Sequence, residues 1–296
     1  MKSILKKAAG IAIAASLVFG LFSCANPSGG DGGTNGKKND PVFTPDTMFK
    51  ITGCPTGDFY ISNTELTYAK WYKVYQWAVK NGYVFQDLGR EGNSGTDGAA
   101  PSANSKQPVT YVSCRDAVVW CNAASEMEGL TPVYEYEGSV LKEAENYNSY
   151  GTNTENTTNV DSGRGKAEKA TVRSGANGYR LPTADEWEYA AKGGANFTYS
   201  GSDNIDEVAW YDSNSESKTH DVGTKKANGY ELHDMSGNVC EWCWDTYTWS
   251  WGSSHYVFCG GCYSSRPGNW SVSGRQVYDP YVQGIKFGFR VVRTAR

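Results

Sequence analysis

Helical periodicity is confined to the earlier part of the chain, and this restricts the fold to a mixed architecture. Apolar residues recur at helical spacing over 66–78, 113–129 and 183–192. Beyond Gly194 the sequence is typical of short strands and loops, and a last strand is expected over 286–292, with Phe287, Phe289 and Val291 on one face. Early helices followed by strands indicate an α+β domain.

Local signals place several of these boundaries. Ser113-Cys-Arg-Asp116 and Thr183-Ala-Asp-Glu186 each put a hydroxyl residue three positions before a carboxylate, the pattern of a capping box. Gly193-Gly194 predicts the end of the last helix. The other expected strands are 59–61 and 108–112. The polar segment 136–178 predicts a long surface excursion, with room for a small hairpin, and no second domain.

The beginning of the chain does not look like folded protein. Lys2, Lys6 and Lys7 precede a short apolar run over 11–22, and Ser23 follows it directly. A basic start, a short apolar run and a small residue at the cleavage point are typical of an export signal rather than a membrane span.

Cys24 adds a lipid anchor to this prediction. Leu21-Phe22-Ser23-Cys24 resembles the bacterial lipobox, in which the cysteine is acylated and becomes the mature N-terminus. An ordinary secretory signal that contains a cysteine is the alternative. Acyl chains would hold the protein to the bacterial outer membrane or cell surface without spanning the bilayer.

The expected organisation has three parts. Residues 1–24 form the lipoprotein signal peptide, and 25–42, rich in Gly, Asn, Ser, Asp and Lys, form a flexible linker. Residues 43–296 are long enough for one domain with a sizeable core. The formal net charge of −4 and the absence of a long Lys/Arg cluster argue against nucleic-acid binding.

Several long motifs, in order along the chain, resemble one known family. Tyr179-Arg-Leu-Pro-Thr-Ala-Asp-Glu-Trp-Glu-Tyr-Ala-Ala-Lys-Gly-Gly194 is similar to the signature of the formylglycine-generating (sulfatase-modifying) enzymes. The further matches are 64–67, 108–117, 234–242, 260–261 and 288–290. The resemblance spans 49–292 and implies the formylglycine-generating-enzyme subtype of the C-type lectin fold, with little regular secondary structure.

The same resemblance bears on catalysis. The enzymes of this family oxidise a substrate cysteine with molecular oxygen and use a copper-binding pair of cysteines, since soft thiolates select Cu(I). Aligned from Gly260-Gly261, those two positions fall on Ser265 and Trp270. Neither side chain supplies a thiolate, so we expect no copper, no catalytic residues and no oxidase activity.

The C-terminal segment resembles a different use of the fold. In diversity-generating retroelements, as in the Treponema variable protein, the stretch ending near Gly-Phe-Arg is hypermutated to vary ligand binding. The corresponding segment here mixes aromatic anchors with small polar groups, as recognition surfaces do. The candidate ligand contacts are Cys262, Ser264, Ser265, Arg266, Gly268, Asn269, Trp270, Tyr278, Asp279 and Tyr281. The alternative is an ordinary polar loop with Trp270 and Tyr278 packed inward.

A structural calcium site is also implied by the resemblance. Its ligands would be the side chains of Asp234 and Glu241 and the main-chain oxygens of Gly237 and Val239, a set of hard oxygen donors. In the alternative, Glu241 pairs with an arginine and the loop needs no ion. A second calcium position of the family falls near Ala209, where no side-chain ligand matches.

The cysteines leave three interpretations open. Cys240-Glu-Trp-Cys243 and Cys259-Gly-Gly-Cys262 have the spacing of a zinc ribbon. Export favours disulfides, and buried free thiols are the third possibility. Cys54, Cys114 and Cys121 are expected in the core.

Aromatic residues are abundant, with 20 Tyr, 10 Trp and 10 Phe. Trp242 and Trp244 are expected to fill the core, whereas Trp249 and Trp251, flanked by serines, are candidates for exposure in a carbohydrate-binding platform.

Three functions remain open. The first is a monomeric surface receptor or adhesin that binds a protein or glycan. The second is an enzyme on the same fold with other ligands. The third is a structural envelope protein whose polar excursion contacts neighbouring surface components.

Overall fold

The computed structural model describes residues 42–44, 47–103, 105–145, 165–248, 254–268 and 270–295, all within the unit 39–296. The expected signal peptide, nearly all of the expected linker, Cys24, Trp249, Trp251 and Asn269 lie outside these residues. Among the described helices, none has the length and apolar character that crossing a bilayer requires.

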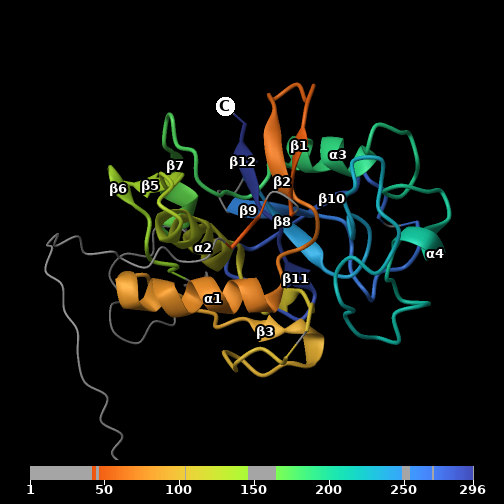
Figure 1. The fold of residues 1–296 in the computed structure, drawn as a ribbon, viewed down its shortest axis with the longest axis horizontal. Helices are drawn as coiled ribbons and strands as arrows, with labels where there is room; N and C mark the ends of the chain where they lie inside the picture. Colours follow the sequence, from red (N-terminus) through yellow and green to blue (C-terminus); the bar gives the residue numbers. More distant parts are fainter. Residues whose placement is uncertain are drawn as a thin grey trace, which may run out of the picture. The chain divides into compact units, whose positions relative to one another are not determined.

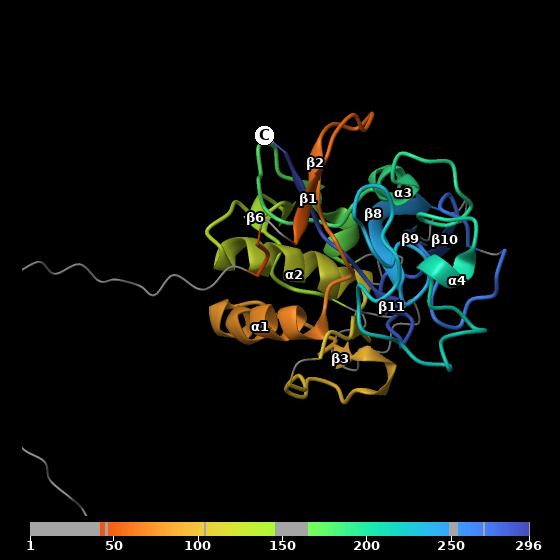
Figure 2. The same cartoon turned by 45° about the vertical axis from the view of Figure 1, so that its right-hand side comes forward.

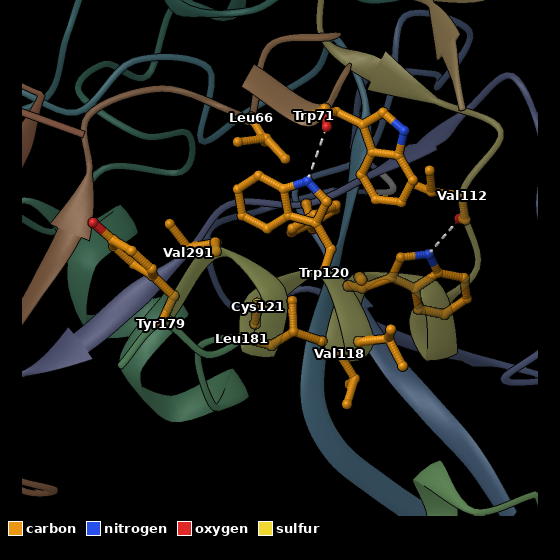
Figure 3. Packing of buried hydrophobic residues seen from close by; sticks show 14 of the residues in the cluster. Leu66, Trp71, Val112, Val118, Trp120, Cys121, Tyr179, Leu181 and Val291 are labelled. Atoms are coloured by element: carbon orange, nitrogen blue, oxygen red, sulfur yellow. Dashed lines mark hydrogen bonds between the residues drawn. The ribbon is translucent and has the colours of Figure 1, made fainter. Parts of the chain in front are cut away.

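Two long helices pack side by side and form one layer of the domain (Figures 1 and 2). They are α1 (Tyr68–Ala78) and α2 (Cys114–Met127), and each begins with a hydroxyl N-cap. Trp71 and Trp120 stack between them with ring centroids 6.2 Å apart. The Trp120 indole N–H donates a hydrogen bond to the Trp71 carbonyl, which fixes the two helices in register (Figure 3).

Short strands make up the rest of the described domain. The largest sheet has the order β10-β9-β8-β11. Its strands are β8 (Cys240–Thr248), β9 (Ser254–Cys259), β10 (Arg275–Tyr278) and β11 (Phe287–Gly288). A second sheet joins β1 (Met48–Ile51), β2 (Phe59–Ser62) and β12 (Val292–Thr294). Smaller sheets contain β3 (Arg90–Glu91), β4 (Val109–Thr110), β5 (Tyr134–Tyr136), β6 (Ser139–Val140) and β7 (Thr171–Val172).

The three predicted helices are confirmed, and their caps explain why. α3 (Ala184–Lys192) has the complete capping box between Thr183 and Glu186, and it ends at Gly193, whose φ of 58° is left-handed. At the start of α2 the Ser113 hydroxyl accepts the Asp116 N–H. A fourth, short helix, α4 (Ile205–Val208), was not predicted.

The predicted strand over 286–292 is wrong. β11 pairs with β8, whereas β12 pairs with β2 in the other sheet. Between them the Phe289 carbonyl accepts the Leu66 N–H at 2.8 Å. Arg290, between the two strands, is buried and directs its guanidinium to Glu241 of β8.

The core predictions are confirmed for Trp242 and the three cysteines, whereas Trp244 is only partly buried against the core. Trp242 is fully buried, and its indole N–H donates to the Val112 carbonyl at 3.2 Å. Trp244 packs on Tyr134 with ring centroids 4.4 Å apart. Cys54, Cys114 and Cys121 are buried free thiols. The expected hairpin near the start of the polar excursion is β5–β6, to which β7 adds a third strand.

Candidate ligand-binding cleft

A small, shallow cleft lies beside the loop that follows β9. Four of the predicted contacts line it, namely Cys262, Ser265, Arg266 and Trp270. The remaining lining residues are Tyr199, Ile205, Ala209, Tyr211, Ser236, Gly237 and Gly260. Aromatic rings, hydroxyls and one guanidinium therefore face a common space, a composition suited to recognition.

Two glycines shape the loop wall. Gly260 and Gly261 have φ values of 88° and 73°, which are left-handed and favour glycine. A Cβ on Gly261 would lie 2.7 Å from the Trp270 ring, so the indole can lie across this position only because no side chain is present. The Cys262 N–H donates to the Ser265 Oγ at 2.9 Å and closes the turn.

Two hydrogen bonds donated by backbone N–H groups connect this loop to the opposite wall of the cleft. The Asp212 N–H donates to the Ser265 carbonyl at 3.1 Å, and the Gly268 N–H donates to the Tyr199 hydroxyl at 3.3 Å. The residues of this wall, 199–211, were missed by the sequence analysis. The sequence pointed to these residues only through the family's second calcium position, which falls near Ala209. That position alone does not predict a cleft.

Other predicted contacts lie outside the cleft lining. Tyr278, at the end of β10, is about half exposed, and its ring contacts Phe258 and Phe287. Asp279 accepts a hydrogen bond from the Tyr281 hydroxyl at 3.0 Å. Ser264 and Gly268 belong to the cleft loop without lining the cleft.

The inward-packing alternative therefore holds in part for the two aromatic candidates. Trp270 is partly buried, with its ring 5.8 Å from that of Phe258, and it also lines the cleft. Tyr278 touches the same core ring from the edge of the sheet while remaining about half exposed.

The four cysteines with zinc-ribbon spacing divide between two core clusters. Cys240 and Cys262 belong to the cluster around α1 and α2. The Cys243 and Cys259 sulfurs lie 3.9 Å apart in the second cluster, beneath α3. Within the described residues no group of metal-type side chains could hold an ion. The four cysteines do not converge on one position, so the zinc-ribbon interpretation is wrong, and none of them forms a disulfide in this structure.

The proposed calcium ligands are engaged by other groups. Glu241 accepts hydrogen bonds from the Arg290 guanidinium at 2.6 and 2.7 Å and from the Trp187 indole at 2.7 Å. Asp234 accepts the Gly223 N–H at 2.6 Å. These contacts match the arginine-paired alternative, in which the loop needs no ion. The calcium site at Asp234, Gly237, Val239 and Glu241 stays an untested prediction, and the contacts of Glu241 favour the alternative.

Electrostatics around Arg290 agree with this interpretation. Burial raises the pKa of Asp234 to about 6. Burial, followed by the charges of Asp234 and Glu241, raises the pKa of Glu65 well above its ordinary value. The guanidinium of Arg290 therefore interacts with the carboxyl groups of Glu241, Asp234 and Glu65. The raised pKa values of Asp234 and Glu65 favour their protonated forms, which reduces the negative charge around Arg290.

Comparison with known proteins agrees with this geometry. The chain matches the model of the sulfatase-modifying factor enzyme 1-like domain over residues 33–295. It is 32% identical to the protein named Chaperone protein LppX of Paenibacillus barcinonensis, over 94% of this chain and 95% of that protein.

Two solved structures extend the likeness to the fold. The crystal structure of CarF has a TM-score of 0.66 and 31% identity, covering 81% of this chain and 87% of that one. Treponema denticola variable protein 1 has a TM-score of 0.59 and 28% identity, covering 81% and 85%. The chain therefore belongs to the sulfatase-modifying factor enzyme 1-like family, with the formylglycine-generating-enzyme type of C-type lectin fold that its motifs predicted.

Proposed function

We propose that this protein binds a protein or glycan ligand at the bacterial surface, to which a lipid on Cys24 anchors it. The observation that carries the proposal is the position of Cys262, Ser265, Arg266 and Trp270, which were predicted as contacts and line one cleft. Tight recognition generally depends on a few aromatic and arginine side chains in such a setting.

The cleft chemistry supports binding over oxidation. The positions that hold copper-binding thiolates in the family's oxidases carry a hydroxyl at Ser265 and an indole at Trp270, and both face the cleft. Neither is a ligand that Cu(I) prefers.

The likeness to a Treponema variable protein supports a further part of the proposal, that the C-terminal face is diversified by a retroelement. Comparison of the coding DNA with the surrounding genome tests this part. We expect a near-copy of the segment encoding 262–286 that differs mainly at adenines. A genome without such a repeat would contradict diversification while leaving binding intact.

A binding screen tests the main proposal. The purified chain is applied to glycan arrays and to host and bacterial surface proteins, beside Arg266→Glu and Trp270→Ala. Hits that depend on the cleft should weaken by about tenfold or more in both variants. Tyr247→Ala is the matched control, because Tyr247 is an exposed aromatic that does not line the cleft. Equal loss in all three variants, or in none, would place recognition elsewhere.

Lipid anchoring is tested separately. Cells that express the chain are fed an alkyne-labelled fatty acid, and we expect label on the wild-type chain and none on Cys24→Ser. A labelled Cys24→Ser chain would contradict the anchor at this cysteine.

An oxidase is the second candidate, because one thiol, that of Cys262, belongs to a residue that lines the cleft. Titration with Cu(I), followed by measurement of oxygen-dependent oxidation of a thiol peptide, tests it. Stoichiometric Cu(I) binding with turnover would favour the enzyme over the binding protein.

A further inference from the structure

The charge of the cleft lining is positive, although the chain as a whole has a formal net charge of −4. Arg266 lines the cleft and is exposed, whereas no aspartate or glutamate belongs to the lining. Within the described part of the chain, no ion pair or hydrogen bond engages the Arg266 guanidinium. The cleft therefore presents a cation that the protein itself does not neutralise.

The acidic residues next to the cleft wall already have partners. The Asp206 carboxylate accepts a hydrogen bond from the Tyr211 hydroxyl at 2.9 Å, and the Asp212 carboxylate accepts one from the Ser213 hydroxyl at 2.9 Å. Neither acid lines the cleft. The N–H donors of Arg266 are thus available to a ligand that enters the cleft.

Two hydroxyls of the lining also have a proton to donate. The Ser236 Oγ accepts the Ser200 N–H at 3.1 Å, and the Tyr199 hydroxyl accepts the Gly268 N–H at 3.3 Å. A hydroxyl that accepts a hydrogen bond keeps its own proton, and no described residue accepts a hydrogen bond from Ser236 or Tyr199. Both residues are more than nine-tenths buried, so their positions are fixed. The cleft therefore suits a group that is rich in hydrogen-bond acceptors.

Trp270 adds a largely apolar surface beside these donors. Its ring centroid lies 5.8 Å from that of Phe258. A Cβ on Gly261 would lie 2.7 Å from the indole, so the ring rests closely on the backbone at this position. The indole is supported by these neighbours and also lines the cleft. A flat aromatic ring in this setting can stack on an apolar face of a ligand.

A single ligand unit must match both kinds of surface, because the cleft is small and shallow. A sugar acid meets this requirement, since one face of its ring presents C–H groups while its carboxylate and hydroxyl oxygens accept hydrogen bonds. An aspartate or glutamate side chain brings a carboxylate without a rigid apolar face. Such a side chain would use the guanidinium and leave the indole to a separate residue.

We propose that the cleft recognises a carboxylate-bearing sugar at the end of a glycan. Arg266 binds the carboxylate with its N–H groups, a charge-assisted contact of the strong kind. Trp270 stacks on the sugar ring, and Ser236 and Tyr199 donate hydrogen bonds to its oxygens. This inference rests on the proposed binding function and specifies the class of ligand.

The test compares matched glycans by surface plasmon resonance with the purified chain. Glycans that end in a sialic or a uronic acid are immobilised, each beside the same glycan with its carboxylate converted to the uncharged amide. We expect at least one acid to bind about tenfold or more tightly than its amide, because hydrogen bonds to charged groups are stronger than those between neutral groups. Absence of a preference for any acid over its amide would overturn the proposal.

Variants assign the preference to the cleft. Arg266→Gln should abolish it, so that acid and amide bind alike. Tyr199→Phe keeps the ring, loses one donor and should weaken binding of both by about threefold. Arg173→Gln is the matched control, because Arg173 is an exposed arginine that does not line the cleft. A preference that survives Arg266→Gln, or that Arg173→Gln removes as well, would contradict the assignment.

Two further comparisons separate this inference from the binding function on which it rests. A peptide rich in aspartate and glutamate should bind at least about tenfold more weakly than the preferred acidic glycan, and equal binding would refute the choice of a sugar. Binding of a neutral glycan or a protein that depends on the cleft, without any preference for an acid, would overturn the sugar-acid assignment and leave the binding function intact. Ligands insensitive to both Arg266→Glu and Trp270→Ala would overturn both.

Discussion

At the scale of single residues, Arg290 is a fully buried charge that lies among carboxyl groups. Its guanidinium binds both oxygens of Glu241 and also donates to the carbonyls of Ser62 and His233. The hydrogen bonds therefore join β8, β2 and the loop before β8 through one side chain. Removal of a single partner would leave an uncompensated buried charge.

The first prediction concerns this pair. Arg290→Met should lower the free energy of unfolding by about 3–5 kcal/mol, because Glu241 would remain buried without its cation. Denaturant unfolding followed by circular dichroism measures the change. Lys226→Met is the control, since the Lys226–Glu207 ion pair is exposed and should contribute about 1 kcal/mol or less. A similarly small loss in Arg290→Met would contradict the role given to Arg290.

The second prediction concerns Asp87, which lies beside Asp116. Burial, followed by the charge of Asp116, raises the pKa of Asp87 from its ordinary 3.8 to about 9. The folded state thus favours the protonated acid. The stability that this group contributes is complete below its unfolded pKa and is lost progressively as the pH rises towards the folded value.

Asp87→Asn mimics the protonated form and tests this directly. The variant should become more stable than the wild-type chain by about 1–2 kcal/mol near pH 8, and the difference should vanish near pH 4. Thermal unfolding over this pH series measures it. Asp97→Asn is the control, because its partner Arg90 lowers the pKa of Asp97 and the replacement should not stabilise the chain at high pH. A pH-independent difference for Asp87→Asn would contradict the shifted pKa.

At the scale of elements, what the sequence predicts depends on how local the cause is. The start of α3 follows from Thr183 and Glu186, which are three residues apart and complete a capping box by themselves. The segment 286–292 could not be predicted in the same way. Its alternation favours one strand, but its two ends pair with strands distant in sequence, β11 with β8 and β12 with β2, so that it is divided between two sheets.

The two walls of the cleft also differ in how far the sequence predicts them. Its loop wall was predictable, because the motif 260–261 and the composition of 262–270 indicate a recognition loop. The other wall, 199–211, depends on long-range bonds such as that from the Asp212 N–H to the Ser265 carbonyl. The sequence also could not predict that the four cysteines divide between two core clusters. A Cys-x-x-Cys spacing does not specify which sheet face or core cluster each sulfur joins.

The third prediction belongs to the cleft loop. Gly261→Ala should cost stability and displace Trp270, because the new Cβ would lie 2.7 Å from the indole. Gly268→Ala separates clash from backbone strain, since Gly268 also has a positive φ, of 86°, but open space around its Cβ position. We expect Gly261→Ala to lose about 1–3 kcal/mol more than Gly268→Ala and to change tryptophan fluorescence. Equal effects of the two variants would show that Trp270 is not held by Gly261.

At the scale of the whole molecule, the buried charges around Arg290 bear on whether the folded domain binds calcium. A calcium ion that bound only the folded chain would raise its midpoint of thermal unfolding in proportion to the logarithm of its concentration. Both oxygens of Glu241 accept hydrogen bonds from Arg290, one of them also from Trp187, and one oxygen of Asp234 accepts the Gly223 N–H, so both carboxylates already have partners in the described domain.

The fourth prediction follows from this arrangement. Unfolding midpoints measured in excess EGTA and in millimolar calcium should agree within about 1 °C, because the guanidinium of Arg290 supplies the positive charge that calcium would bring. Glu241→Gln tests the cause: it should destabilise the chain equally in both buffers, since what it weakens is the ion pair with Arg290. A midpoint that rises with calcium in the wild-type chain and not in Glu241→Gln would instead assign Glu241 to the metal, and Arg290 would then have to move away from it in the loaded protein.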